Sequence, residues 1–236
     1  MPKDIAATHE DWEAIADTFH RTRRRPWPSV LEWSLEAVPR GGRVLDLAGG
    51  NGRHGVPLAQ DGYRVVLADF SRRLASHADR ERRTRDPAIP FQVVQASAPT
   101  LPLQTGSMDG ALFIAALHNI PGRTNRIAAL AELHRVLKPG APALVTVWSR
   151  WQQKYALDFL KELPSAVLKD RRTFGDRTVP WSEDGSIVER YYHFYSRWEL
   201  REDLHAAGFD NPRIWSKCIS TKVWADNLFA EVRRPA

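Results

Sequence analysis

The segment at residues 44–54, VLDLAGGNGRH, combines an apolar run that ends at Asp46 with Gly49, Gly50 and Gly52. A hydrophobic strand followed by a glycine-rich turn and a helix lets backbone N–H groups approach a ligand closely. A second apolar run ends at Asp69, 23 residues after Asp46, near the spacing of about 20 residues at which an acidic side chain meets a ribose. A carboxylate there accepts hydrogen bonds from both ribose hydroxyls and disfavours a 2′-phosphate. We therefore expect a site for a ribose-bearing ligand.

Apolar runs and amphipathic segments alternate around these residues. Strand patterns occur at 43–47, 63–69, 91–96, 109–117 and 141–149, and helical patterns at 53–61, from Ser71, and at 124–137. Strands that alternate with helices and are apolar throughout indicate a parallel sheet covered on both faces. Two closing strands are expected near 212–219 and 222–231, and helices near 10–20 and 29–38. The sequence thus predicts an α/β fold, a doubly wound, mostly parallel seven-stranded sheet with an N-terminal helical extension.

We expect one domain over residues 1–236. Between 151 and 190 the periodicity weakens, which indicates an insertion with one short helix. Regular patterns return at 196–209, where Ser196 and Glu199 have capping-box spacing and Gly208 is a helix stop. The expected parts are N-terminal helices with a basic lid segment (1–40), a ligand-binding core (41–150), the insertion (151–190) and the C-terminal part of the sheet (191–236).

The composition excludes several classes of protein. No apolar run approaches the roughly 18 to 20 residues of a bilayer span, and residues 1–19 lack the apolar stretch of a secretory signal. We therefore expect a cytoplasmic protein without a membrane partner. Cys218 is the single cysteine, so the chain can form neither an internal disulfide nor a cysteine-based zinc cluster, and we expect no metal site.

Arginine dominates the basic residues. Of the 34 Lys and Arg residues 27 are Arg, with a formal net charge of +6 and basic runs at 21–25, 72–73, 80–85 and 171–172. Arginine suits bidentate phosphate contacts, so a polyanionic partner is one interpretation. The alternative is a compositional bias that places Arg on solvated faces.

The glycine turn resembles the Asp/Glu-x-Gly-x-Gly-x-Gly turn of class I S-adenosylmethionine-dependent methyltransferases, with Ala48 in place of the first glycine. Asp69, the SMDG segment at 107–110 and the LKPG segment at 137–140 extend this resemblance over residues 40–150. It implies S-adenosyl-L-methionine as the cofactor. Ser97 stands where the family places the Asp that accepts from the adenine amino group. The residues implied to bind the donor are Asp46, Ala48, Gly50, Asn51, Gly52, Asp69, Phe70, Ser97, Ala98 and Ala115.

The flanking segments resemble a narrower family, the tRNA wobble-uridine carboxymethyl methyltransferases. TRRRPWP at 22–28 resembles its TR-x-x-PWP element, and residues 114–140 resemble its stretch from IA-x-x-HH to PGG. Residues 145–149 (VTVWS) and 191–209 are similar to its last core strand and to its Tyr-His-x-Phe segment. The matching positions are Arg23, His118, Arg126, Tyr192, His193 and Phe194, whereas Asn119 replaces the family's second histidine.

This resemblance implies methyl transfer to the carboxylate of a modified wobble uridine in tRNA, which gives a methyl ester. Because a carboxylate is already ionised at pH 7, no general base is needed. Arg23, His118 and His193 are implied to position that carboxylate. The resemblance also implies tRNA rather than DNA as the partner, with a possible small zinc-ribbon activator protein.

Two other functions stay open. One is methylation of a small carboxylate or phenol, with the Arg excess merely compositional. The other is a non-catalytic donor- or RNA-binding subunit, suggested by Ala48 and Ser97. Taken alone, His118 also has a simpler interpretation as a structural histidine.

Overall fold

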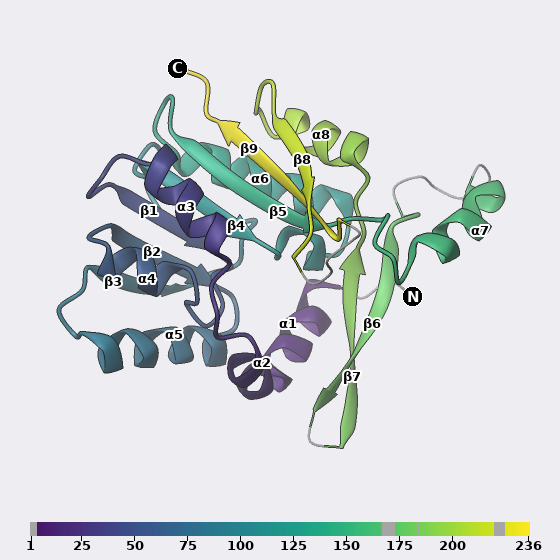
Figure 1. Cartoon of the computed structure of the whole chain (residues 1–236), viewed down its shortest axis with the longest axis horizontal. Coiled ribbons are helices and arrows are strands. Elements are labelled where there is room, and N and C mark those ends of the chain that lie inside the picture. The colour runs from purple at the N-terminus through teal and green to yellow at the C-terminus, as the bar shows by residue number, and fades with distance from the viewer. Residues whose placement is uncertain (1–3, 167–172, 184, 220–224) are drawn as a thin grey trace.

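A seven-stranded sheet forms the centre of the protein. The computed structural model describes residues 4–166, 173–183, 185–219 and 225–236. Its strand order is β3-β2-β1-β4-β5-β9-β8, with β9 antiparallel to both neighbours and the other pairs parallel (Figure 1). This confirms the predicted doubly wound, mostly parallel sheet. The strands are β1 (Arg43–Leu47), β2 (Arg64–Asp69), β3 (Phe91–Gln95), β4 (Gly110–Ile114), β5 (Pro142–Trp148), β8 (Arg213–Lys217) and β9 (Asn227–Arg233).

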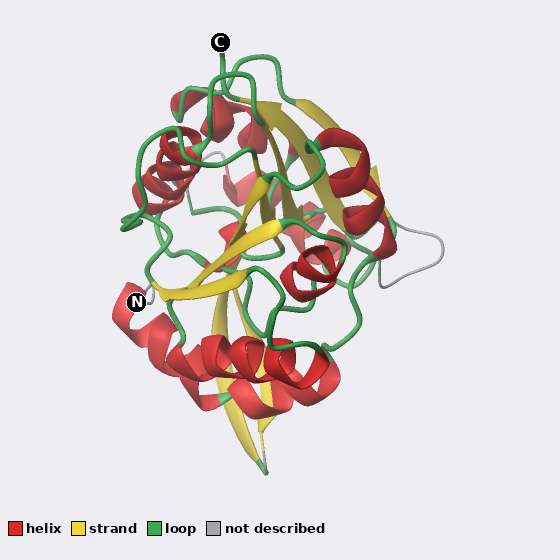
Figure 2. Cartoon of the chain, turned by 90° about the vertical axis from the view of Figure 1, so that its left-hand side faces the viewer, coloured by secondary structure: helices red, strands yellow, loops and turns green. Residues whose placement is uncertain are grey.

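Helices cover both faces of the sheet, as the turned view in Figure 2 shows. Leu45 and Leu47 of β1 pack in one cluster with side chains of α6 and α8, whereas Val44 packs in a second cluster with α3 and α4. Burial on both faces explains why these strands are apolar throughout. The helices are α3 (Pro28–Ala37), α4 (Gly55–Gln60), α5 (Arg72–Arg85), α6 (Arg123–Val136) and α8 (Arg197–Ala206).

The order of the parallel strands reverses between β1 and β4, because β1 pairs with β2 on one side and β4 on the other. Ligands of open α/β sheets bind beyond the carboxyl ends of strands at such a point. The chain leaves both strands through left-handed residues, Ala48 with φ of 51° and Ala115 with φ of 52°. A short 3-10 helix, η1 (Leu117–Asn119), follows β4. The fold therefore directs the glycine turn and the 115–119 segment to the same edge of the sheet.

The N-terminal extension consists of two helices before α3. The helix predicted at 10–20 is instead α1 (Ile5–Ala14) and α2 (Ala16–Thr22), separated at Ile15, whose backbone leaves the helical region. Trp12, Ile15 and Ala16 are buried in one cluster with Leu74 of α5. The extension is thus packed against the core of the protein.

The insertion has more structure than the sequence predicts. It contains the expected helix, α7 (Ala156–Ala166), and also an antiparallel hairpin of β6 (Asp176–Glu183) and β7 (Ser186–His193). In Figure 1 the hairpin runs beside α1 and extends past it, and α1 contacts β7. The expectation of a loop with one helix is therefore wrong for residues 176–190. The strand predicted at 212–219 corresponds to β8 and that at 222–231 to β9, although residues 222–224 of the second prediction lie outside the described residues.

Across the described parts of the chain, no helix has the length and apolar character that a bilayer crossing needs.

Candidate functional site

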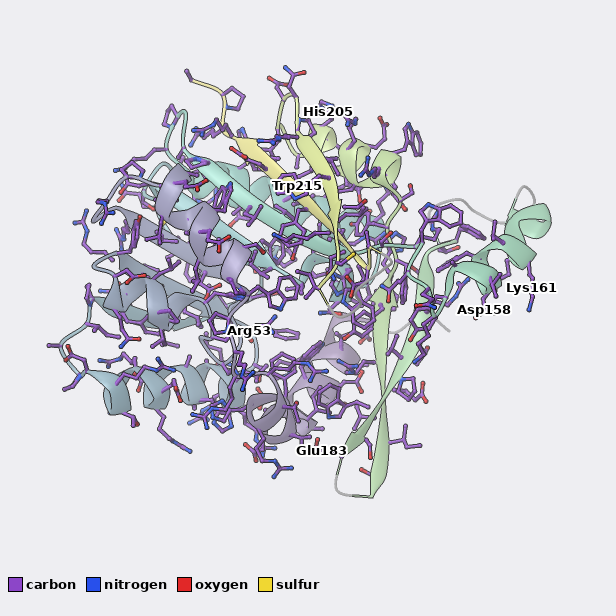
Figure 3. All side chains as sticks on the ribbon, in the orientation of Figure 1. Arg53, Asp158, Lys161, Glu183, His205 and Trp215 are labelled. Carbon is purple, nitrogen blue, oxygen red and sulfur yellow. The ribbon has the colours of Figure 1, made fainter. Side chains whose placement is uncertain are left out.

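A cavity of about 470 Å³ lies at the carboxyl ends of β1, β2 and β4. Its volume falls in the range of about 300 to 1,000 Å³ usual for small-molecule sites. The N-terminal helices contribute Trp12 and Phe19 to its wall, and the hairpin contributes Trp181, Arg190 and Tyr192. In Figure 3, Arg53, which also lines the cavity, lies between the sheet and the N-terminal helices. Three segments far apart in the sequence therefore enclose one site.

The glycine turn forms the floor of the cavity. Ala48, Gly50 and Gly52 all have positive φ, at 51°, 58° and 77°. A Cβ placed on Gly50 would meet nothing nearer than Phe19 at 3.8 Å, whereas one on Gly52 would lie 3.0 Å from Ala78 of α5. Gly50 thus leaves open space for a ligand, but Gly52 does not line the cavity. Gly52 lets the turn approach α5, and its contact with the donor stays a prediction.

Two buried carboxylates stand at the ends of β1 and β2. Asp69 accepts hydrogen bonds from the N–H of Gly50 at 2.8 Å and of Ser71 at 2.9 Å, one on each carboxylate oxygen. Asp46 accepts from the N–H of Gly55 at 3.0 Å. Burial raises the pKa of Asp46 to about 7 and that of Asp69 to about 6, with the backbone donors acting in the opposite direction. Each oxygen of Asp69 keeps a lone pair for a further donor, so the arrangement fits a ribose diol beside a cationic ligand.

The other residues predicted to bind the donor gather around this pair. Nine of the ten line the cavity, namely Asp46, Ala48, Gly50, Asn51, Asp69, Phe70, Ser97, Ala98 and Ala115. The open space above Gly50 and the carboxylate of Asp69 provide a cradle that fits the adenosyl part of S-adenosylmethionine. Their individual contacts with the donor stay predictions.

Two buried polar residues attach the N-terminal segment to the glycine turn. The side-chain amide of Asn51 donates to the carbonyl of Arg23 at 3.1 Å, and Nε2 of His54 accepts from the N–H of Trp27 at 3.2 Å. Burial lowers the pKa of His54 well below its usual value, which keeps this ring neutral as the acceptor requires. The basic segment is thereby held over the cavity.

Arg23 and His118, two of the three residues predicted to position the substrate, line the cavity. His118 is 1% exposed, and its ring stacks with Trp148 and Tyr192 at 5.6 and 5.2 Å. Its Nδ1 accepts from the N–H of Trp148 at 3.2 Å. Burial, with His193 and Arg190 nearby, lowers the pKa of His118 to about 3. The ring is therefore neutral and offers a single Nε2–H donor, and its contact with the substrate stays a prediction.

His193, the third residue predicted to position the substrate, lies outside the cavity. Its ring is fully buried, with Nδ1 2.6 Å from Asp176 and Nε2 2.8 Å from Glu199. Glu199 also pairs with Arg150 at 2.9 Å. Because both ring nitrogens face carboxylates, His193 joins β7 to β6 and α8, and the prediction that it contacts substrate is wrong.

Arg126 is also excluded from the cavity wall. It is fully buried and donates to the hydroxyl of Tyr191 at 3.1 Å. Of the late aromatic segment, Tyr192 lines the cavity, while Phe194 packs in the core of the insertion.

Sequence reasoning missed Arg190, Arg53 and Trp181, which line the cavity as well. Arg53 adjoins the glycine turn and could have been included on that ground. Arg190 and Trp181 belong to the hairpin, whose register places them and which the sequence pattern did not indicate.

Comparisons with known proteins agree with this geometry. Residues 44–140 match the model of a family described as a methyltransferase domain. The chain is 36% identical over 179 residues to tRNA (carboxymethyluridine(34)-5-O)-methyltransferase ALKBH8 of Macaca fascicularis, a match that covers 76% of this chain and 24% of the relative. It is 26% identical to the Schizosaccharomyces pombe enzyme of the same activity, covering 85% of this chain and 87% of the relative. It is also 33% identical to demethylmenaquinone methyltransferase of Beutenbergia cavernae, covering 70% of each. The chain thus spans about a quarter of the length of the animal relatives that it matches.

Solved structures share the fold. A SAM-dependent methyltransferase of Methanosarcina mazei superimposes with a TM-score of 0.70 and 22% identity, over 89% of this chain and 99% of the other. A Burkholderia thailandensis methyltransferase with bound 1,6-didemethyltoxoflavin and S-adenosylhomocysteine has a TM-score of 0.65 and 21% identity, over 100% and 94%. A methyltransferase in complex with the Haloferax volcanii Trm112 activator has a TM-score of 0.64 and 17% identity, over 97% and 98%. With its relatives, the family match and the doubly wound fold, this chain belongs to the class I S-adenosylmethionine-dependent methyltransferases.

Proposed function

We propose that this protein transfers a methyl group from S-adenosylmethionine to the carboxymethyl group of a modified wobble uridine in tRNA. One observation carries the proposal. Arg23 lines the same cavity as the glycine turn and belongs to the basic segment 21–25, in which Arg21, Arg24 and Arg25 are exposed. A substrate bound there would contact the donor site and a basic surface at once. The relatives named as tRNA carboxymethyluridine methyltransferases support this choice of substrate.

When bound, S-adenosylmethionine supplies an electrophilic methyl group on a sulfonium. A carboxylate oxygen forms the new C–O bond as the C–S bond breaks, so that a carboxylate and a sulfonium become a neutral ester and a thioether. No proton moves, and the chain needs no general base. The residues of the cavity position the acceptor: the guanidinium of Arg23 and the Nε2–H of His118 donate hydrogen bonds to it, and the aromatic wall excludes water.

The basic segment at 21–25 is a better phosphate site than the run at 80–85. On α5, Arg82 and Arg83 both pair with Asp79, and Arg85 pairs with Glu81. In the segment 21–25, Arg24 pairs with Glu81 at 3.4 Å, whereas no carboxylate among the described residues forms an ion pair with Arg25, which lies between α2 and α3. We therefore assign tRNA backbone contacts mainly to residues 21–25.

A zinc-ribbon activator is part of the proposal. The neighbour crystallised with the Trm112 activator shares the fold, and β8 is an edge strand of the sheet. We assign the docking surface to an exposed sheet edge, and co-purification with such an activator tests it.

Methylation of a small phenol or quinol is the alternative. Trp27, Trp148, Trp181 and Tyr192 give the cavity an aromatic wall suited to a flat apolar acceptor, and one set of relatives is named demethylmenaquinone methyltransferase. The arginines that line the cavity favour the anionic acceptor instead.

A methyl-transfer assay with two alternative acceptors tests the proposal. Labelled S-adenosylmethionine is incubated with tRNA lacking wobble esters, with and without a zinc-ribbon activator, and separately with a small quinol. We expect label in tRNA and none in the quinol. Label in the quinol alone would favour the alternative, and donor binding without transfer to either acceptor would indicate a non-catalytic subunit.

A further inference from the structure

Arg190 of β7 is a buried arginine on the wall of the cavity. Its exposed fraction is 5%, and it lines the cavity together with Trp12, Trp181 and Tyr192. The guanidinium lies over all three rings, with its carbon 5.4, 4.6 and 5.0 Å from their centroids. One Nη1–H donates to the hydroxyl of Tyr192 at 2.6 Å. The aromatic rings fix the side chain without neutralising it.

Within the described part of the chain, no carboxylate forms an ion pair with this cation. The buried Nε of Arg190 also has no hydrogen-bond partner among the described residues. Arg150, by comparison, is partly buried and pairs with Glu199 at 2.9 Å. Asp11 attracts Arg190 electrostatically without forming an ion pair. A buried cation without an ion-pair partner is costly, because one hydrogen bond and aromatic contacts replace only part of its lost hydration. Arg190 is therefore able to form an ion pair with an anion that enters the cavity.

A second arginine strengthens this conclusion. Arg23 lies over the same ring, with its guanidinium carbon 5.4 Å from Trp181. Two cations thus approach one tryptophan, and their mutual repulsion would be relieved by an anion bound between them. The aromatic contact of Tyr192 with His118 places the Nε2–H donor of His118 in the same half of the cavity.

From this arrangement we infer that Arg190 binds the carboxylate of the methyl acceptor and selects anionic over neutral acceptors. The inference rests on the proposed function, because that function supplies the carboxylate. Methyl transfer removes the negative charge and leaves an ester that cannot pair with Arg190. The same residue would then hold the substrate and release the product.

Calorimetry on the full-length protein saturated with S-adenosylhomocysteine tests the role of Arg190. The ligands are the nucleoside 5-carboxymethyluridine and its neutral amide, 5-carbamoylmethyluridine. We expect the wild type to prefer the acid by roughly 10- to 100-fold, the range for a hydrogen-bonded charge. Arg190→Met should abolish this preference, and Arg190→Lys should keep part of it.

The matched control is Arg177→Met on the other strand of the hairpin. Arg177 stacks on Phe159 and pairs with Glu162 outside the cavity, so the control should keep the wild-type preference for the acid. Unchanged S-adenosylhomocysteine affinity in Arg190→Met would show that the donor half remains folded. Arg190→Met with the full wild-type preference would overturn the inference while leaving the proposed function intact.

A wild type that neither binds nor methylates carboxymethyluridine would instead contradict the proposed function. The role of Arg190 is then tested by comparing the affinities for phenylacetate and phenylacetamide, a carboxylate and its amide that lack the uridine. A preference for phenylacetate that Arg190→Met removes would support an anion-binding role. No preference in the wild type would overturn that role as well.

Discussion

Replacing Asp69 by Asn separates stability from donor binding. The folded protein raises the pKa of Asp69 from 3.8 to about 6, mainly through burial. A carboxyl with a raised pKa contributes stability that is present below its unfolded pKa and is lost as the pH rises through the folded value. The loss approaches about 1.4 kcal/mol per pH unit only between the unfolded and the folded pKa. Over the interval from pH 4 to 7 the wild type should therefore lose roughly 2 kcal/mol of stability at this site. The amide introduced by Asp69→Asn does not ionise, so the variant loses nothing at this position over that interval.

The variant also loses a backbone hydrogen bond. An Asn side chain has one acceptor oxygen, whereas Asp69 accepts from both Gly50 and Ser71. This loss costs about 1 to 3 kcal/mol at any pH. We therefore expect Asp69→Asn to be less stable than the wild type at pH 4, with the difference shrinking by roughly 2 kcal/mol at pH 7. Urea denaturation at both pH values measures the difference.

Donor binding should behave in the opposite way. At pH 7 the wild type offers an ionised acceptor to the ribose hydroxyls, and hydrogen bonds to a charged group contribute about 1.5 to 3 kcal/mol each. Asp69→Asn should therefore weaken S-adenosylhomocysteine binding by about 100-fold or more. Calorimetric affinity within about threefold of the wild type would refute the assignment of Asp69 to the donor.

Asp109→Asn is the matched control for the pH dependence. Asp109 lies at the opposite end of the sheet and accepts from the N–H of Arg43. Burial raises the pKa of this carboxyl, but the Arg43 N–H and Lys138 outweigh it and lower the pKa overall. A carboxyl with a lowered pKa contributes stability that is already present above its unfolded pKa of 3.8, so the stability deficit of Asp109→Asn should stay nearly constant from pH 4 to 7. If the difference in unfolding free energy from the wild type shrinks between pH 4 and 7 in both variants, the role of burial at Asp69 is contradicted.

Three other substitutions give independent tests. Ala48→Gly should stabilise the protein by about 0.5 to 1 kcal/mol in urea denaturation. Ala48 has a φ of 51°, and the relief of left-handed strain exceeds the cost of the greater backbone entropy that glycine has in the unfolded chain. The control Ala111→Gly in β4 should destabilise the protein. Glu199→Gln should cost about 3 kcal/mol of unfolding free energy, since Arg150 and His193 lose their carboxylate, whereas exposed Glu202→Gln should change little. Arg25→Ala should lower the slope of log tRNA affinity against log salt by about one, and an unchanged slope would place the RNA elsewhere.

The sequence predicted the parts of the fold whose patterns are local. The glycine turn, the helix that starts at Ser71, the capping serine Ser196 and the apolar strands each depend on neighbouring residues, and all appear in the structure. Ser196 accepts from the N–H of Glu199 as its spacing predicts. The carboxylate of Glu199, however, binds His193 and Arg150 instead of closing a capping box. Local spacing predicted the helix start but not the tertiary partners of the same residue.

The sequence predicted the site residues that lie at the strand ends but not those that lie in the hairpin of the insertion. Asp46 and Asp69 follow apolar strands, so their meeting at one sheet edge could be inferred. Arg190 and Trp181 meet only because β6 and β7 pair across residues 176–193, and Pro180 within β6 conceals the strand pattern. His193 shows the converse error, since its type suggested a donor to substrate while burial between two carboxylates assigns it a structural position.

Analysis of the methylated product tests the central claim most directly. Purified protein, with its activator if one is required, is incubated with S-adenosylmethionine and tRNA that carries 5-carboxymethyluridine at the wobble position, and the tRNA is digested to nucleosides. We expect a wobble nucleoside heavier by one methyl group that mild alkali converts back to the acid, as an ester requires. A methyl group that resists alkali, or that lies on another nucleoside, would contradict methylation of the wobble carboxylate.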